Sequence, residues 1–268
     1  MPLPLFDVTT DPGPDFSALV RRSGVTLPSA GEAGLNLAHA TTVVALKFAD
    51  GVIMAGDRRA TAGSAIAHRS MEKVFPADKY SAVAISGSAA VASEMVRLFQ
   101  VQLEHYEKVE GVALSLEGKA NQLAQMVRTN LGMAMQGFVV IPLFCGYDLA
   151  RGTGRIFDYD AAGGRYEEAD FQATGSGGTY ARTTIRLGYR DGLAADDAVE
   201  LAILSLYEAA DADSATGGPD SVRGIYPIIA TVTAQGYEQL ADEEVAARFQ
   251  AIIERRRAAG GNAEGTLR

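Results

Sequence analysis

The chain has 268 residues, and its 24 basic and 33 acidic side chains give a formal net charge of −9 at pH 7. This length fits one large domain or two small ones, and a content of 47% hydrophobic and 21% charged residues excludes wholesale disorder. The acidic balance argues against nucleic acid as the main partner, because a surface that binds phosphate groups is usually basic.

Residues 1–40 differ in composition from the rest of the chain. They hold five of the nine prolines and several glycines, and they show no long periodic apolar pattern. Such a segment buries little surface on its own. Two interpretations follow: a disordered tail, or a pro-segment that is removed on maturation.

The following half of the chain contains predicted strands and two helices. An Asp50-Gly51 pair lies between two apolar runs, which is a strong hairpin signal. Further on, apolar residues recur at helical spacing, and we assign the apolar faces of these helices to the core. The predicted elements are strands at 42–48, 51–57 and 80–86, and helices around 91–106 and 120–135.

The last part of the chain again has strands first and helices after them. Strands are predicted at 138–147, 154–160, 165–174 (one or two) and 225–233, and helices at 179–187, 194–211 and 242–257, before a C-terminal tail at 258–268. Strands and helices in blocks, rather than in strict alternation, favour an α+β fold with antiparallel sheets. We predict a four-layer αββα sandwich over residues 41–257, with two antiparallel sheets packed face to face and helices outside.

Cysteine and histidine are too scarce for several kinds of site. Cys145 is the one cysteine, which excludes an internal disulfide framework and favours a reducing compartment. The three histidines leave little for a zinc site, so no metal or cofactor is expected. No basic residue precedes Arg21, and the longest apolar run, 138–145, is too short for a bilayer. We therefore expect a cytoplasmic protein that does not bind membranes.

A threonine at a chain N-terminus is the nucleophile that remains once other sites are set aside. The segment Thr174-Gly-Ser-Gly-Gly178 lacks the first glycine of a nucleophile elbow, and no Lys-Ser/Thr pair follows as in a phosphate-binding loop. No histidine is placed to serve a serine or cysteine triad. An N-terminal threonine needs none, because its own α-amine, with a pKa of about 8, accepts the hydroxyl proton. Thr41 lies where residues 1–40 meet the first strand, so cleavage before it would expose such a group.

Short motifs spread from residue 41 to about residue 255 carry a resemblance to a known family. They are Thr41-Thr-Val-Val-Ala-Leu46, Gly56-Asp-Arg-Arg-Ala-Thr61, Lys73-Val74, Ser86-Gly-Ser-Ala-Ala90, Gly175-Ser-Gly177 and Asp211-Ala-Asp-Ser214. Together they resemble the β subunit of the 20S proteasome of actinobacterial type, an N-terminal nucleophile hydrolase. The resemblance implies a threonine-type endopeptidase that degrades unfolded proteins.

The resemblance also implies a role for each matching residue. Thr41 would be the nucleophile and, through its amine, the general base. Lys73 would be the buried cation beside it, and Asp57 would hold that lysine charged and oriented. The backbone N–H of Gly87 would form the oxyanion hole, where such a donor contributes about 3–4 kcal/mol. The hydrogen-bond network around the amine would consist of Ser176, Asp211 and Ser214.

The implied substrate site lies beside the nucleophile. The backbones of Thr61 and Ala89 would pair with an extended peptide as an added strand. The pocket lining would be uncharged, so cleavage after hydrophobic residues is expected. Met71, Phe75 and Ile85 fit a plain core role equally well. The expected lining residues are Ala60, Met71, Phe75, Ile85, Ala89 and Ser93.

Ala40 departs from the family pattern. The family usually has glycine before the nucleophile, because self-cleavage after that residue requires a tight turn. Alanine is small enough for this turn, but slower processing is expected. Self-cleavage after Ala40 would release residues 1–40 and start the mature chain at Thr41.

The resemblance implies partners and leaves alternatives. Homo-heptameric β rings would stack with rings of proteasome α subunits, and a regulatory ATPase would feed unfolded or tagged proteins through the α ring. One alternative is a non-catalytic structural ring subunit, which the presence of Thr41, Asp57 and Lys73 disfavours. Another is a two-ring bacterial threonine peptidase without α subunits, which the long N-terminal segment disfavours. An unrelated N-terminal nucleophile amidohydrolase is more remote.

Overall fold

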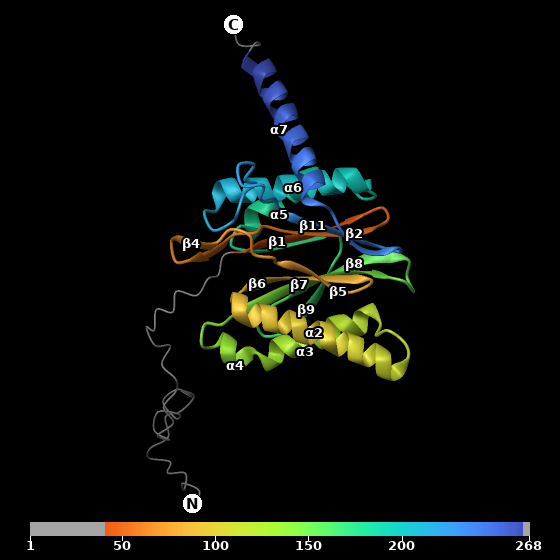
Figure 1. Ribbon diagram of the computed structural model, residues 1–268. Helices are drawn as coiled ribbons and strands as arrows, with labels where there is room; N and C mark the ends of the chain where they lie inside the picture. Colours follow the sequence, from red (N-terminus) through yellow and green to blue (C-terminus); the bar gives the residue numbers. More distant parts are fainter. Residues whose placement is uncertain (1–40, 265–268) are drawn as a thin grey trace, which may run out of the picture. The chain divides into compact units, whose positions relative to one another are not determined.

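The protein forms four layers in a computed structural model that describes residues 41–264. Two antiparallel sheets are stacked, and helices cover the outer face of each sheet (Figure 1). The predicted α+β sandwich is confirmed. The segment 1–40, including Ala40, and residues 265–268 lie outside the described residues.

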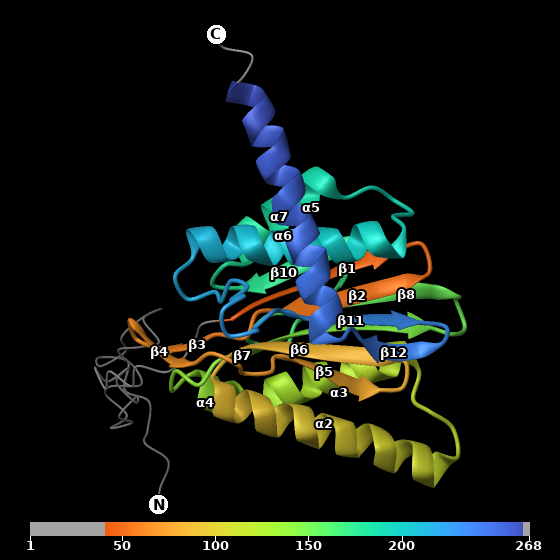
Figure 2. The same cartoon turned by 45° about the horizontal axis from the view of Figure 1, so that its top comes forward.

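The strands form two five-stranded sheets and one separate ribbon. The first sheet consists of β1 (Thr42–Phe48), β2 (Gly51–Gly56), β10 (Phe171–Gly175), β11 (Ile228–Thr233) and β12 (Gly236–Gln239). The second consists of β5 (Val74–Asp78), β6 (Ser81–Gly87), β7 (Val140–Asp148), β8 (Thr153–Tyr159) and β9 (Arg165–Glu168). The ribbon consists of β3 (Ala60–Ala62) and β4 (Ala65–His68), which project from one end of the sandwich (Figure 2).

Strand order brings segments that are distant in sequence side by side. The order is β10-β1-β2-β11-β12 in the first sheet and β5-β6-β7-β8-β9 in the second, and neighbouring strands are antiparallel. The predicted hairpin at Asp50-Gly51 is confirmed, because β1 and β2 pair directly with Val43 opposite Gly56. On its other side β1 pairs with β10, and Thr42 lies opposite Gly175.

Helices cover both outer faces of the sandwich. The first sheet is covered by α5 (Gly178–Gly188), α6 (Ala195–Ala212) and α7 (Asp242–Glu264), and the second by α2 (Ala89–Glu110), α3 (Leu116–Thr129) and the short α4 (Leu131–Ala134) (Figure 1). The far half of α7 extends beyond the sandwich in both views (Figures 1 and 2). Within residues 41–264, no helix is both long and apolar enough to cross a membrane.

Three apolar layers hold the sandwich together. Alternate residues of β1 point to opposite faces: Val44 and Leu46 pack against α5, α6 and α7, whereas Val43 and Ala45 pack between the two sheets. The third layer lies between the second sheet and the helices α2 and α3. Both faces of each sheet are therefore buried, which explains why β1 and β2 are nearly continuous apolar runs.

Several elements differ from the sequence prediction. The helix expected at 120–135 is divided at Asn130 into α3 and α4, and the last helix continues past Arg257 to Glu264. The run 165–174 gives two strands that belong to different sheets. The short strands β3, β4, β5 and β12 were not predicted, because three to five residues are too few for a clear period.

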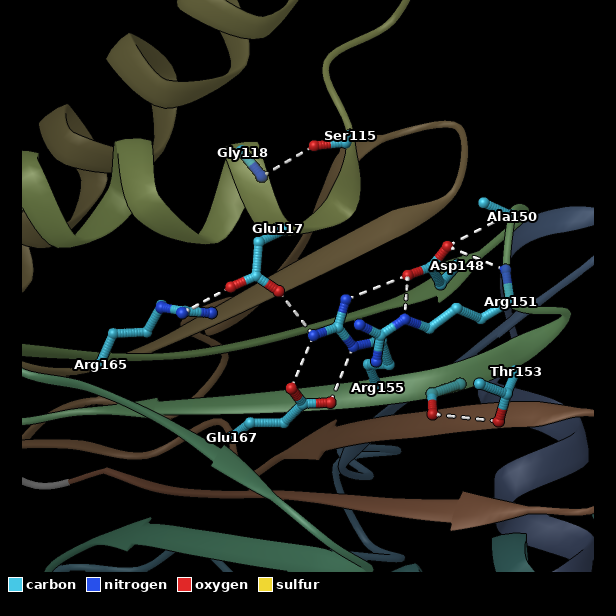
Figure 3. A network of polar contacts seen from close by, with 11 residues as sticks. Ser115, Glu117, Gly118, Asp148, Ala150, Arg151, Thr153, Arg155, Arg165 and Glu167 are labelled. Atoms are coloured by element: carbon cyan, nitrogen blue, oxygen red, sulfur yellow. Dashed lines mark hydrogen bonds and ion pairs between the residues drawn. The ribbon is translucent and has the colours of Figure 1, made fainter.

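A buried arginine ties helix α3 to the second sheet (Figure 3). Only 3% of the Arg155 side chain is exposed, and its guanidinium donates to Glu167, Asp148 and Glu117 over 2.6–3.0 Å. Arg155 lowers the pKa of Glu117 and of Glu167. At Asp148 burial raises the pKa, but hydrogen bonds from Arg155 and nearby backbone N–H groups outweigh it and hold the pKa below its ordinary value.

Arg155→Met is expected to lower the free energy of unfolding by about 3 kcal/mol at pH 7, because three partly buried carboxylates lose their shared partner. Carboxylates with lowered pKa values stabilise the fold above their unfolded pKa, and this contribution is lost as the pH falls through the folded values. The cost of the substitution should therefore be smaller at acidic pH. Urea unfolding at several pH values measures it. The exposed Arg190–Asp197 pair is the control, since Arg190→Met should cost less than about 1 kcal/mol.

Candidate active site

Thr41 lies at the end of the sandwich where several strands begin or end. It directly precedes β1, is 5% exposed, and its carbonyl accepts a hydrogen bond from Ser176 N at 2.9 Å. The approach is close, since a Cβ on Gly175 would lie 1.7 Å from the Thr41 carbonyl oxygen. Gly175 also has φ +99°, so this position favours glycine on both grounds. This close backbone contact with Gly175 and Ser176 thus fixes the position of Thr41 at the start of β1.

Asp57 is a fully buried carboxylate that follows β2. Its Oδ1 accepts from Thr42 N at 2.8 Å and Lys73 Nζ at 2.6 Å, and its Oδ2 accepts from Arg59 N and Gly217 N, both at 2.8 Å. Four donors compensate the cost of burying this charge. Asp57 therefore joins the start of β1, the segment after β2 and the loop after α6.

Lys73 lies just before β5, with 2% of its side chain exposed. Its ammonium donates to Asp57 Oδ1 at 2.6 Å and to the Arg59 carbonyl at 2.5 Å. Burial lowers the pKa of Lys73 below its ordinary value, while the Asp57 carboxylate opposes this shift by stabilising the charged form. The site thus contains a buried lysine whose charged form is stabilised by the Asp57 carboxylate.

Gly87 ends β6 on the facing sheet. Its φ is +113°, and a Cβ at this position would lie 2.1 Å from the Val139 carbonyl oxygen. Any other residue would therefore distort the junction of β6 with α2. Gly87 lines the same cavity as Thr41 and Lys73, so backbone from the second sheet faces the threonine from the first.

This cavity brings together most of the residues predicted for a substrate pocket. Its lining comprises Thr41, Ala60, Met71, Glu72, Lys73, Phe75, Ile85, Gly87, Ala89, Ala92 and Ser93. Ile85 and Phe75 also pack in the adjoining apolar layer, so they serve cavity and core together. Thr61 lies outside the lining, on β3, where it pairs with Ile66. Among residues 41–264 no group of acidic, histidine and cysteine side chains is suited to a metal ion.

A hydroxyl and carboxylate chain completes the site. Ser176 Oγ and Thr216 Oγ1 each donate to Asp213 Oδ2 at 2.6 Å, and Thr216 Oγ1 also lies 2.6 Å from Thr42 Oγ1. Burial raises the pKa of Asp213, but the hydrogen bonds from Ser176 and Thr216 outweigh it and hold the pKa below its ordinary value. These hydrogen bonds link the loop after α6 to the start of the first strand.

Comparisons with known proteins agree over most of the chain. The family model described as "Proteasome subunit" matches residues 37–223. The chain is 59% identical over 260 residues to "Proteasome subunit beta" of Acidimicrobium ferrooxidans, covering 94% of this chain and 95% of the relative. It is 56% identical over 218 residues to the protein of the same name from Streptomyces griseus, covering 81% and 78%.

The chain belongs to the proteasome subunit family. Both relatives are named β subunits, so the resemblance to actinobacterial β subunits is confirmed. The family match, over residues 37–223, spans the segments that supply Thr41, Asp57, Lys73 and Gly87. The proteasome-family fold therefore accounts for the convergence of these four segments at one end of the sandwich.

Two predicted residues of this proteasome-family site are placed elsewhere by the structure. Asp211 is exposed in the last turn of α6, and Ser214 is exposed, with its carbonyl accepting from Arg59 at 2.9 Å. Asp213 and Thr216 occupy the network instead. The sequence allows both registers, because an acid is followed three residues later by a hydroxyl residue in each. The end of α6 decides which acid joins the network, since Asp213 follows the last helical turn with an extended backbone.

The cavity lining also contains two residues that were not predicted for the pocket, Glu72 and Ala92. Glu72 is exposed and lies between Met71 and Lys73, where the chain runs along the cavity. The six predicted lining residues are all present and carry no charge.

Proposed function

We propose that this chain is a threonine-type endopeptidase subunit of a proteasome core particle, with Thr41 as the nucleophile after cleavage of the Ala40–Thr41 bond. One observation carries this proposal: Thr41 shares a cavity with the Asp57-bound Lys73 and with the backbone of Gly87. Membership of the proteasome family supports it. Residues 1–40 would be the pro-segment, and residues 41–257 the catalytic domain.

In the proposed chemistry, the nucleophile and the general base both belong to Thr41. The Thr41 hydroxyl attacks the peptide carbonyl, and its α-amine takes the proton and passes it to the leaving amine. The resulting ester is hydrolysed by water, which regenerates the hydroxyl. A charged Lys73 favours the unprotonated amine by Coulomb repulsion, and Asp57 keeps that lysine charged. The Gly87 N–H stabilises the oxyanion.

Peptide substrates would bind in an extended form. In the described part of the chain β3 pairs only with β4, so its second edge, at Thr61, is available to an added strand. Ala89 would pair with the peptide from the facing side. Met71, Phe75 and Ile85 supply most of the apolar lining, which supports cleavage after hydrophobic residues.

Assembly into rings is the second part of the proposal. Helix α2 exposes Leu98 (49%), Val101 (60%) and Val109 (64%), and Val112 follows it at 63%. Leu98 follows the helical spacing of the apolar face of α2, but its side chain is exposed. Apolar residues grouped in this way usually mark an interface. They support contact with a neighbouring subunit. The proposed assembly consists of heptameric β rings stacked on α-subunit rings, with a regulatory ATPase that delivers unfolded or tagged proteins.

Co-expression with a proteasome α subunit tests the proposal. We expect assembled particles whose β chain begins at Thr41 by intact mass, and which hydrolyse fluorogenic peptides with a hydrophobic residue before the cleaved bond. Assembled particles that retain residues 1–40 and still hydrolyse peptides would contradict the nucleophile assignment. Full activity of the β chain in rings without α subunits would instead favour the two-ring peptidase.

Asp213→Asn is expected to lower kcat about 100-fold with little change in KM, because Ser176 and Thr216 lose the carboxylate that orients them. Asp211→Asn is the matched control two residues earlier, and it should keep wild-type kcat because its side chain is exposed. Steady-state kinetics on assembled particles measure both variants. Loss of activity in the Asp211 variant alone would reverse the assignment.

A further inference from the structure

A second small cavity lies next to residues that bind Asp57, because Arg59 and Gly217 both line it. It is lined by Arg58, Arg59 and Arg69, together with Gly217, Gly218, Asp220, Ile225, Tyr226 and Pro227. Three arginines line this one cavity in a chain whose net charge is −9. The proposed peptidase chemistry does not use their side chains, and the cavity is separate from the one beside Thr41.

The positive charge at this cavity is only partly balanced. Arg58, whose side chain is 15% exposed, pairs with Asp242 at 2.6 Å, and this is the one ion pair that the three arginines make within residues 41–264. Arg59 donates to the neutral Ser214 carbonyl. The lining carboxylate, Asp220, is held by Arg223 at 2.7 Å. Two of the three cations therefore have no carboxylate partner in the described structure.

One donor at the cavity is also unsatisfied. Arg58 Nε is buried and has no hydrogen-bond partner among the described residues. A buried N–H of a charged group without an acceptor is costly, so an acceptor at this place is expected to stabilise the fold. The cavity measures about 20 Å³, which is enough space for a water molecule or a small anion.

We propose that the cavity lined by Arg58, Arg59 and Arg69 is a binding site for a small monovalent anion of halide size. The anion would accept from the guanidinium groups and balance the two unpaired cations. This site does not depend on the proposed peptidase activity, although Arg59 belongs to both regions, since its backbone N–H and carbonyl bind Asp57 and Lys73.

Bromide is a suitable probe, because its anomalous scattering identifies it among light atoms. Crystals of the full chain in sodium bromide are expected to show an anomalous peak in this cavity, which is absent from the Arg69→Gln variant. Arg69 is exposed, so this variant should fold. A cavity that holds only water, or the carboxylate of an adjacent protein molecule, would overturn the proposal.

Thermal unfolding gives a second measurement in solution. At constant ionic strength, replacing methanesulfonate by chloride is expected to raise the melting temperature of the wild type, because a ligand that binds only the folded state stabilises it. The rise should disappear in Arg69→Gln and persist in Arg223→Gln, a neighbouring exposed arginine outside the lining. An equal rise in Arg69→Gln would also overturn the proposal. Neither result alters the test of peptidase activity.

Discussion

Replacing Thr41 with alanine is expected to abolish peptide hydrolysis and to leave residues 1–40 attached to the chain. Both effects have one cause, since the Thr41 hydroxyl would attack the preceding carbonyl during processing and the substrate carbonyl afterwards. The fold should survive, because alanine keeps the backbone carbonyl that accepts the hydrogen bond from Ser176 N. Intact mass and a fluorogenic peptide assay on assembled particles measure the two effects together.

Thr41→Ser is the matched control for this experiment. Serine keeps both the hydroxyl and the α-amine, so this variant should still be processed and retain a substantial part of the activity. A second control expresses the alanine variant with its first residue already at position 41. It should assemble and remain inactive, which separates loss of processing from loss of chemistry. Clear hydrolysis by either alanine variant would exclude Thr41 as the nucleophile.

The larger elements of the fold were predictable because their patterns are long. The apolar runs on either side of Asp50-Gly51 predict two strands, and the helical spacing of the following segment predicts α2. In each case the pattern gives the kind of element and its approximate bounds. The pairing of β1 with β10 was not predictable by pattern, since these strands are more than 120 residues apart and register is decided by packing. The β3–β4 ribbon was missed because its strands are short and largely exposed.

The candidate site shows where sequence motifs lose precision. Thr41, Asp57 and Lys73 each stand at the end of an apolar run, so a motif fixes their positions without ambiguity. At the end of α6, however, two acids, Asp211 and Asp213, are each followed three residues later by a hydroxyl residue. Only the point at which the helix ends, at Ala212, turns Asp213 rather than Asp211 toward Ser176. Tertiary geometry was needed to choose between them.

Asp57→Asn is expected to reduce activity by at least about 10³-fold and to lower the free energy of unfolding by about 3–5 kcal/mol. The carboxylate accepts four hydrogen bonds, two on each oxygen, whereas an amide offers only one acceptor oxygen. Lys73 would also lose the negative charge of its hydrogen-bonded partner while it stays buried, so its pKa would fall further.

The pH dependence of stability distinguishes this explanation from simple loss of packing. When burial lowers the pKa of a lysine, the unfolded chain binds more protons, and stability rises with pH up to the ordinary lysine pKa. The destabilisation by Asp57→Asn should therefore be larger at pH 6 than at pH 9, as measured by urea unfolding. Asp78→Asn is the matched control, because it removes the partner of another buried lysine, Lys119, far from Thr41. It should lower stability and leave kcat of assembled particles unchanged, whereas equal stability loss of the Asp57 variant at both pH values would exclude Lys73 as the cause.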